Sequence, residues 1–321
     1  MVTQTQKDTA QAIVNIFETN SVLGDYGMVT LLAGDSGHLT FGRSQTTLGS
    51  GNLFKLIRDY CNKPDARFSV KLNPYLKRLE SRDLSLDHDD YFKNILRATA
   101  DDPVMRTTQD EFFDTEYWKS AERNAKNTGI QTALGIAVVY DSLVHGSWQY
   151  IKSQTNNNNG LLASIGEQKW IAAYVENRRN WLANHSKKIL RNTVYRMDAL
   201  QRLIALEQWN LELPLVVRGQ EISTVTLNAT PKGCFDGPEP GSRSLQVQTP
   251  LLKGRDVRLL QLGLSCNGID VIADGVFGTA SLSAVKLYQS QNGLNVTEKV
   301  DVQVILQIID NASLIPLQNK L

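Results

Sequence analysis

The sequence predicts a mainly helical α+β fold followed by a smaller helical domain. Apolar residues recur at helical spacing in six segments before residue 208. A short stretch with the character of two strands interrupts them between residues 28 and 41. After Pro214 the composition shifts toward Gly, Pro, Ser and Thr, and a compact apolar pattern resumes at Pro250. Helices with one segregated antiparallel element define the α+β class, and the shift in composition predicts a domain boundary.

The N-terminal part is predicted to contain two helices around a pair of strands. Residues 8–20 and 52–61 place apolar side chains at helical spacing. Between them, residues 28–32 and 39–41 have the pattern of short strands, and a polar turn at residues 34–37 joins them. We therefore expect a two-stranded antiparallel excursion between the two helices.

Helices also dominate the chain between residues 108 and 207. They are predicted over residues 108–126, 128–154, 163–182 and 186–207. Because residues 133–140 are apolar throughout, the second of these helices is predicted to lie in the core. The polar tract at residues 156–159, which ends in Gly160, is predicted to be a loop.

The stretch after Pro214 is predicted to be an irregular linker with one strand at residues 221–227. We therefore place a first domain at residues 1–219, a linker at 220–249 and a second domain at 250–321. A chain of 321 residues is long enough for one large domain and one small domain.

The composition indicates a globular protein whose partners are not nucleic acids. The chain has Lys+Arg 34 against Asp+Glu 33, and a net charge of +1 argues against binding nucleic acid through overall electrostatics. The three cysteines lie far apart and the four histidines lack ligand spacing. Neither a disulfide framework nor a metal site is therefore predicted, and we expect no metal and no cofactor.

The N-terminal segment lacks the basic and then apolar pattern of a secretory signal, and no apolar run is long enough to span a membrane. If the substrate lies outside the cytoplasm, in the periplasm or at the cell wall, we expect delivery by lysis or by a specialised secretion system. The other possibility is that a leader has been removed.

Two acidic residues near the N-terminus suggest the chemistry. Glu18 lies near the end of the first predicted helix beside apolar residues, whereas Asp35 lies in the polar turn. Unlike environments separate the pKa values of two carboxyl groups, so that one donates a proton while the other accepts one. Glycoside hydrolysis requires this division of labour. The alternative is that both are solvated surface charges, the usual state of acidic residues.

Three motifs in the C-terminal domain have a characteristic order. They are Gly-x-Asp-Val-Arg-x-Leu-Gln at residues 254–261, Asp-Gly-Val-Phe-Gly at 274–278 and Ala-Val-x-x-Tyr-Gln at 284–289. This segment resembles the three-helix peptidoglycan-binding domain of bacterial wall hydrolases. Its core is expected to include Val257, Leu260, Leu264, Val285 and Tyr288. The alternative is that the bundle only packs against the first domain or binds a protein.

Several polar positions follow one another across the first domain. They are Glu18, Asp35, Thr40, Asp141, His145, Arg178, Arg196, Asp198, Arg202 and the segment 210–213. In these positions the domain resembles the family 46 chitosanases, which are relatives of lysozyme. The resemblance implies a two-lobed, lysozyme-like α+β fold with a small β element. It also implies endo-acting hydrolysis of a β-1,4-linked amino-sugar polymer, with inversion at the anomeric carbon.

The resemblance further implies a role for each catalytic candidate. Glu18 is expected to be the general acid that protonates the glycosidic oxygen, and Asp35 the general base that takes a proton from the attacking water. Thr40 is expected to orient that water. Inversion requires about 6.5 to 9.5 Å between the two carboxyl groups.

A buried Arg-Asp-Arg relay lies behind the acid in this family. Arg202, Asp141 and Arg178 fall at the matching positions, where they would tune Glu18 and hold it in place. They are also interpretable as a structural ion network between helices, and the two interpretations are compatible.

Three further residues are candidates for binding the substrate. Asp25 is expected either to bind sugar or to cap a turn. Arg43 and Gln45 follow a glycine at the end of a predicted strand, where they are candidates for lining the cleft. Trp181 and Trp209 are expected to pack in the core rather than to stack on sugar.

The charge of the candidate cleft residues favours peptidoglycan over chitosan as the polysaccharide partner. Chitosan is polycationic and requires acidic residues, whereas the lactyl and peptide carboxylates of peptidoglycan require Arg, Lys and amide donors. The candidate residues for lining the cleft are His38, Arg43, Gln45 and Asn52. We therefore expect a muramidase-like endolysin or secreted effector. The alternatives are a chitosanase and a non-catalytic wall-binding protein, and the sequence does not identify an inhibitor or immunity protein.

Overall fold

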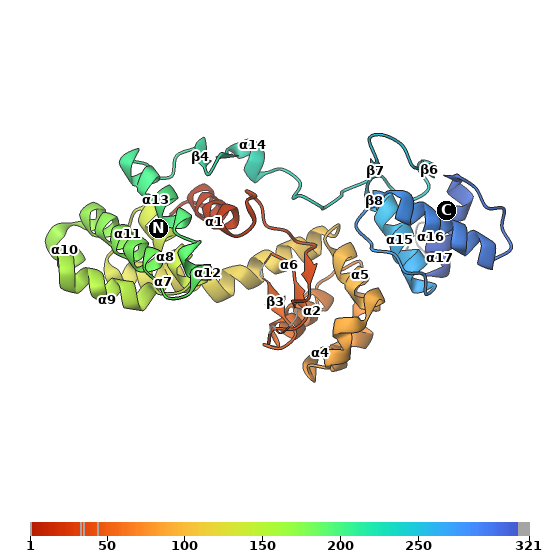
Figure 1. Ribbon diagram of the computed structural model, residues 1–321, viewed down its shortest axis with the longest axis horizontal. Helices are drawn as coiled ribbons and strands as arrows, with labels where there is room; N and C mark the ends of the chain where they lie inside the picture. The colour runs from red at the N-terminus through yellow and green to blue at the C-terminus, as the bar shows by residue number, and fades with distance from the viewer. Residues whose placement is uncertain (1, 33, 35, 44, 314–321) are drawn as a thin grey trace. The chain divides into compact units, whose positions relative to one another are not determined.

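The computed structural model describes residues 2–313 apart from residues 33, 35 and 44. The chain forms two compact units, each built from two segments (Figure 1). The first unit contains Met1–Gly24 and Phe113–Ala229, and the second contains Asp25–Phe112 and Thr230–Leu321. Among the described residues, no helix combines the length and the apolar character needed to cross a membrane.

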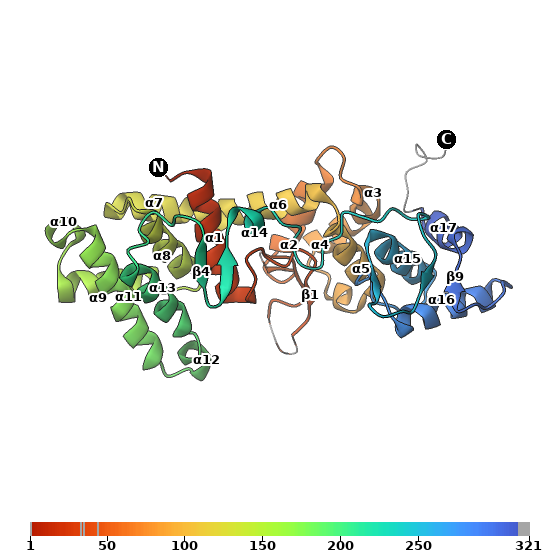
Figure 2. The same cartoon turned by 90° about the horizontal axis from the view of Figure 1, so that it is seen from above.

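The first unit is a bundle of helices around α8. Its longer helices are α1 (Gln4–Thr19), α7 (Lys119–Thr128), α8 (Ala133–Val144), α9 (Trp148–Asn159), α11 (Glu167–Ala183) and α13 (Tyr195–Ala205). Its shorter elements are α10 (Leu162–Ile165), α12 (Lys188–Arg191), α14 (Thr224–Leu227) and the hairpin of β4 (Leu215–Val217) and β5 (Gln220–Ile222). Helix α8 packs against α1, α7 and α11 and is buried from residue 133 to residue 142, as its apolar sequence predicts (Figures 1 and 2).

Helix α1 begins and ends with specific capping contacts. At its start, the Thr3 hydroxyl accepts from the Gln6 amide while the Gln6 side chain accepts from the Thr3 amide, which is a reciprocal capping box. At its end, Asn20 adopts a left-handed conformation with φ 56°. The predicted helix at residues 8–20 is therefore confirmed and extends further toward the N-terminus.

Four predictions for the first unit are wrong in detail. The helix predicted over residues 186–207 is two helices, α12 and α13, and the strand predicted at residues 221–227 is β5 followed by α14. The single helix predicted over residues 128–154 is two helices, because the chain breaks at residues 145–147 between α8 and α9. The tract at 156–159 is the last turn of α9 rather than a loop, since Asn156 accepts a hydrogen bond from the Trp170 indole and Asn159 accepts one from Asn177. Asn side chains disfavour helices by bonding the local backbone, and here two of them bond other side chains instead.

The second unit contains the three-stranded sheet and further helices. The strands β1 (Val29–Thr30), β2 (Thr40–Phe41) and β3 (Thr46–Thr47) form an antiparallel sheet in that order, with Val29 opposite Phe41 and Phe41 opposite Thr46. The third strand was not predicted, so the expected two-stranded element has three strands. The helices of this segment are α2 (Asn52–Cys61), α3 (Ser69–Leu72), α4 (Leu76–Glu80), α5 (Asp90–Thr99) and α6 (Pro103–Phe113). Of these, α2 confirms a prediction.

The C-terminal part of the second unit has the predicted three helices. They are α15 (Arg255–Cys266), α16 (Thr279–Gln291) and α17 (Val302–Asn311), with the strand pairs β6 (Leu245–Gln246) with β9 (Lys299–Val300), and β7 (Leu252–Lys253) with β8 (Val276–Phe277). Gln261 explains two of the sequence motifs. Its side chain accepts from the Gly275 amide at 2.8 Å and donates to Asp274 Oδ1 at 2.9 Å, so it fixes the Asp-Gly turn before α16. All five predicted core residues of this domain are buried.

This three-helix domain packs against residues 25–112 and is not an isolated bundle. Helix α15 contacts α5, and the two share one hydrophobic core. Asn94 on α5 donates to Val271 O at 2.7 Å and accepts from the Ala273 amide at 3.0 Å. Arg258 on α15 forms a buried ion pair with Asp101, 2.9 Å between Nη1 and Oδ1. The possibility that the bundle packs against the first domain is therefore realised, and wall binding is compatible with it.

Replacing Asn94 by Ala is expected to destabilise the second unit by about 1–3 kcal/mol, because it leaves the buried Val271 carbonyl and Ala273 amide without this partner. The free energy of unfolding of Asn94→Ala and of Asn295→Ala, an exposed position in the C-terminal domain, is to be measured by urea denaturation. Equal stability of the two variants would show that the packing is not supported by this residue.

Candidate active site

Glu18 lies in the last turn of α1, next to the buried Phe17. Its carboxylate accepts a hydrogen bond from Arg196 Nη2 at 2.7 Å, and its side chain is 34% exposed. The Phe17 ring packs 5.2 Å from the Arg196 guanidinium carbon, and the Phe17 carbonyl accepts from the Tyr195 hydroxyl at 2.7 Å. The expected apolar neighbours are therefore present, but an arginine faces the carboxylate itself. The Glu18 carboxyl group is therefore accessible to solvent and held in a fixed position, as a general acid requires.

A chain of buried charges connects Glu18 to the centre of the bundle. Arg196 Nε donates to Asp141 Oδ1 at 2.9 Å, and Arg178 Nη1 donates to Asp141 Oδ2 at 2.5 Å. The side chains of Asp141 and Arg178 are fully buried, and that of Arg196 is 2% exposed. Burial alone raises the pKa of Asp141, but the guanidiniums of Arg196 and Arg178 outweigh it and hold the pKa below its usual value. The relay is therefore charged throughout.

The relay contains Arg196 where the sequence analysis placed Arg202, so that choice is corrected. Both arginines lie on α13, six residues apart, and 3.6 residues per turn places them on different sides of the helix. Arg196 shares the buried face with Met197, Leu200 and Leu203, whereas Arg202 is exposed. The sequence segment contains both arginines, and only the burial pattern of α13 distinguishes them.

The exchange Arg196→Lys is expected to lower kcat by about 10- to 100-fold, because an ammonium group cannot bind Glu18 and Asp141 through a planar fork. The matched exchange Arg202→Lys, on the exposed face of the same helix, is expected to leave kcat within about twofold. Turnover of both variants on the substrate of the wild type checks this. Equal losses of kcat in the two variants would contradict the assignment of Arg196, rather than Arg202, to the relay.

The break between α8 and α9 holds Arg178 in place. Arg178 donates to Ser142 Oγ at 3.0 Å, to Ser147 Oγ at 3.1 Å and to the Gly146 carbonyl at 3.3 Å. Its Nη2 also lies 3.2 Å from His145 Nδ1. Because a guanidinium has only donors, this ring nitrogen must accept, so His145 is neutral. Burial, reinforced by Arg196 and Arg178, lowers the pKa of His145 to about 4.

His145 is expected to make stability depend on pH between about 6.5 and 4. Its pKa is lowered on folding, so the unfolded chain takes up the proton first as the pH falls, and the stability contributed by the neutral ring is lost through this window. The exchange His145→Gln keeps an acceptor but removes the titration. Urea unfolding at pH 7 and pH 4.5 should therefore show a larger loss in wild type than in the variant. Parallel losses would contradict this assignment.

In the second unit, Asp87 holds the turn that precedes β2. Asp87 is buried in the helical turn Leu84–His88 and accepts from the Leu39 amide at 2.9 Å. Its second oxygen lies 2.8 Å from His38 Nδ1, and His38 has the left-handed φ of 58°. Thr40, the predicted water-orienting residue, donates to the His38 carbonyl at 3.1 Å. Asp35, the predicted general base, lies outside the described residues.

Arg43 is held inside the second unit. Its guanidinium forms an ion pair with Asp110 and donates to the Tyr26 hydroxyl at 3.2 Å, and its side chain is 6% exposed. The Tyr26 hydroxyl in turn donates to Asp110 at 2.7 Å. The geometry thus assigns Arg43 to a structural network that sequence analysis did not foresee. The signal that was missed is the pair of polar residues at 109 and 110 on α6.

The two other predicted substrate-binding residues lie in turns. Asp25 accepts a hydrogen bond from the Gly27 amide at 3.1 Å, which is the turn-capping alternative considered for it. Gln45 is exposed and has φ 47°, and its backbone N–H donates to the Gly42 carbonyl. Of the predicted set, the structure therefore brings together Glu18, Asp141 and Arg178, joined by the newly found Arg196.

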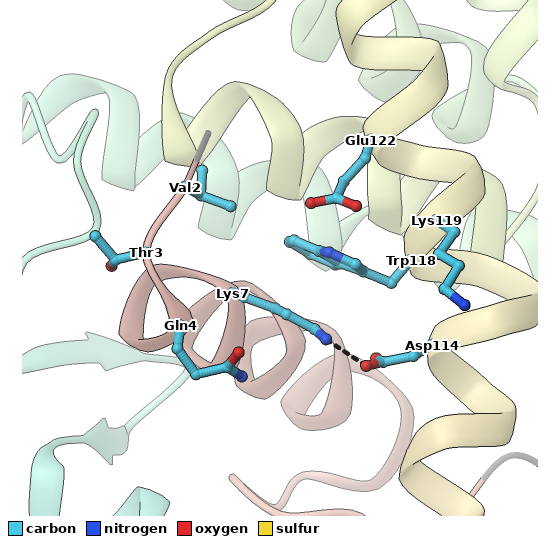
Figure 3. Close-up of a pocket in the computed structure, with 8 residues that line it drawn as sticks. All are labelled: Val2, Thr3, Gln4, Lys7, Asp114, Trp118, Lys119 and Glu122. Atoms are coloured by element: carbon cyan, nitrogen blue, oxygen red, sulfur yellow. Dashed lines mark hydrogen bonds and ion pairs between the residues drawn. The ribbon is translucent and has the colours of Figure 1, made fainter.

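A hollow of about 240 Å³ lies at the opposite end of α1 from Glu18 (Figure 3). Its lining includes Lys7, which pairs with Asp114, and Trp118, whose ring centroid lies 5.8 Å from Lys7 Nζ. The hollow does not contain the relay residues. Within the described part of the chain, no group of three or more His, Cys, Asp or Glu residues is placed to hold a metal ion.

Comparison with known proteins gives the class of this enzyme. Residues 12–215 match glycosyl hydrolase family 46, and residues 253–307 match a peptidoglycan binding domain. A chitosanase of Bacillus subtilis strain 168 is 30% identical over 232 residues, which are 67% of this chain and 83% of that protein. With the buried relay behind Glu18, these matches define a glycoside hydrolase.

Solved structures agree with this class. The native chitosanase of Bacillus subtilis MY002 superposes with a TM-score of 0.56 at 28% identity, covering 68% of this chain and 96% of that chain. A family 46 chitosanase of Gynuella sunshinyii in complex with chitotetraose has a TM-score of 0.56 at 22% identity, covering 70% and 99%, and supports the fold alone. The chain belongs to glycosyl hydrolase family 46 and carries a C-terminal peptidoglycan-binding domain. The predicted fold class is confirmed.

Proposed function

We propose that this enzyme is an endo-acting, inverting β-1,4-glycosidase that cleaves the glycan strands of peptidoglycan. The observation that carries the proposal is the union of two features in one chain. A family 46 domain holds Glu18 on a buried Arg-Asp-Arg relay, and a peptidoglycan-binding domain packs into the second unit. The site of action would then be the cell wall, outside the cytoplasm or in the periplasm, reached by lysis or a specialised secretion system.

In this proposal Glu18 is the general acid and Asp35 the general base. Glu18 gives its proton to the glycosidic oxygen as the bond to the anomeric carbon breaks, and the resulting carboxylate is stabilised by Arg196. Asp35 takes a proton from a water that attacks the opposite face of the sugar, which inverts the anomeric configuration. The Thr40 hydroxyl donates to His38, so its oxygen can accept a hydrogen bond from that water.

Chitosan is the second candidate substrate, because the curated relative at 30% identity is a chitosanase. Both polymers share a β-1,4-linked amino-sugar backbone, so the same catalytic groups serve either one. They differ in charge: chitosan carries ammonium groups, whereas peptidoglycan carries carboxylates. The C-terminal peptidoglycan-binding domain favours peptidoglycan.

Turnover of each polymer tests the proposal directly. Wild-type enzyme and Glu18→Gln are incubated with purified peptidoglycan stripped of teichoic acid and with chitosan. New reducing ends are counted, the products are identified by mass spectrometry, and the anomer first formed is read by NMR. Cleavage of peptidoglycan by wild type alone, with inversion, supports the proposal. Cleavage of chitosan alone replaces it with the second candidate.

A further inference from the structure

Three aromatic rings form a ladder on the surface of the first unit. Tyr150 on α9 packs against Trp181 near the end of α11, with 6.0 Å between ring centroids. Trp181 packs in turn against His185, with 4.9 Å between centroids. Tyr150 is 53% exposed, and the other two rings are partly exposed although Trp181 also contacts the core. Exposed rings with a polar edge are typical of recognition surfaces.

A cluster of positive charge follows the ladder along the chain. Lys187, Lys188 and Arg191 are exposed, and no carboxylate of the described residues lies within ion-pair distance of them. Arg191 donates to the carbonyls of His185 and Ser186 at 2.7 and 2.8 Å, which fixes the turn between α11 and α12. The cluster is therefore a group of exposed cations without a counter-ion among the described residues, and Arg191 is its fixed member.

The turn also orients His185. The Lys187 amide donates to His185 Nδ1 at 3.0 Å. With Nδ1 accepting, the proton of the neutral ring lies on Nε2, which can donate to an external acceptor. The ladder therefore ends in a hydrogen-bond donor beside two lysines.

The helices that carry this surface also carry the residues that hold Glu18. Trp181 lies one turn after Arg178 on α11, and Tyr150 lies one turn after Ser147, which binds Arg178. On the other side, α12 leads into α13 (Figure 2). Arg196 on α13 binds Glu18. The aromatic ladder and the cations therefore lie on or beside the helices that carry Arg178 and Arg196.

We propose that this basic aromatic surface (Tyr150, Trp181, His185, Lys187, Lys188 and Arg191) binds the carboxylate-bearing part of the glycan on which Glu18 acts. The rings stack on pyranose faces, and the cations bind lactyl or peptide carboxylates. The proposal rests on the proposed function and adds the device that selects the polymer. A polycation such as chitosan gains nothing from these charges and is repelled by them.

Charge reversal with a matched control tests the surface. The variant Lys187→Glu/Lys188→Glu is compared with Lys126→Glu/Lys169→Glu, which changes two exposed lysines elsewhere in the first unit and gives the same net charge. On soluble, teichoic-acid-free peptidoglycan fragments, KM is expected to rise about tenfold in the first variant relative to the second, with kcat unchanged. On chitosan, the first variant is expected to bind at least as well as the control. Equal KM values for peptidoglycan in the two variants would overturn the proposal.

The aromatic part has its own test, because Tyr150 is exposed and its replacement does not disturb the core. Tyr150→Ala is expected to raise KM severalfold, while Tyr150→Phe keeps the ring and retains the KM of wild type. A rise of equal size in both variants would overturn the stacking role.

Binding measurements separate this proposal from the proposed function. If wild type does not cleave peptidoglycan, the proposed function fails, and the charge-reversed pairs are then compared by equilibrium binding of the fragments in the Glu18→Gln background. Weaker binding only in Lys187→Glu/Lys188→Glu supports the surface, and equal binding rejects it.

Discussion

Glu18→Gln is expected to lower kcat by about 1,000-fold or more without unfolding the protein, because general acid catalysis contributes about 10²- to 10⁴-fold and the amide has no proton to give. The amide oxygen can still accept from Arg196 Nη2, so the contact that holds the side chain is retained. KM is expected to change little. Release of reducing ends measures the loss, and Glu221→Gln, an exposed position on β5, is the control.

A substrate with a good leaving group distinguishes an acid from other roles. An aryl oligosaccharide whose phenolate needs no proton should be cleaved by Glu18→Gln with a much smaller loss than the polymer. Asp35→Asn should lose activity on both substrates, because the proposed general base takes a proton from the attacking water whatever the leaving group is. A loss below about tenfold for Glu18→Gln on the polymer would remove Glu18 as the general acid.

The sequence predicts those elements that are determined locally. Helix α1 follows from the spacing of its apolar residues and from the capping box that Thr3 forms with Gln6. The three C-terminal helices follow from motifs whose residues contact one another, as Gln261 contacts Gly275 and Asp274. In both cases the partners lie close together in sequence or within one small domain.

The parts that the sequence leaves open depend on distant contacts. Arg196 and Arg202 are equivalent in the sequence until Leu200 and Leu203 define the buried face of α13. The break after α8 becomes intelligible only when Arg178, more than thirty residues later, binds its serines and carbonyl. The packing of α15 on α5 joins residues far apart in the chain, and neither helix alone predicts it.

Asp141→Ala is expected to destabilise the first unit by about 3–5 kcal/mol, because it leaves two buried guanidiniums without their shared counter-ion. Asp141→Asn should cost less, since an amide still accepts from one arginine. The pKa of Asp141 is held below its usual value, so the stability that its charge contributes is present above pH 4 and is lost only at lower pH. The gap in unfolding free energy between wild type and Asp141→Asn should therefore stay constant from pH 7 to pH 4.5.

Activity then separates a structural network from a catalytic one. Assays of Asp141→Asn are made at a temperature and urea concentration where circular dichroism shows it folded. If Asp141 acts only by tying helices together, the folded variant turns over like wild type. If it also positions Glu18 through Arg196, kcat falls while KM is unchanged. The reason is that Arg196 no longer holds Glu18 in position for proton transfer, whereas substrate binding does not depend on this contact. We expect the second result, since the guanidinium that Asp141 holds in place is the one that donates to Glu18.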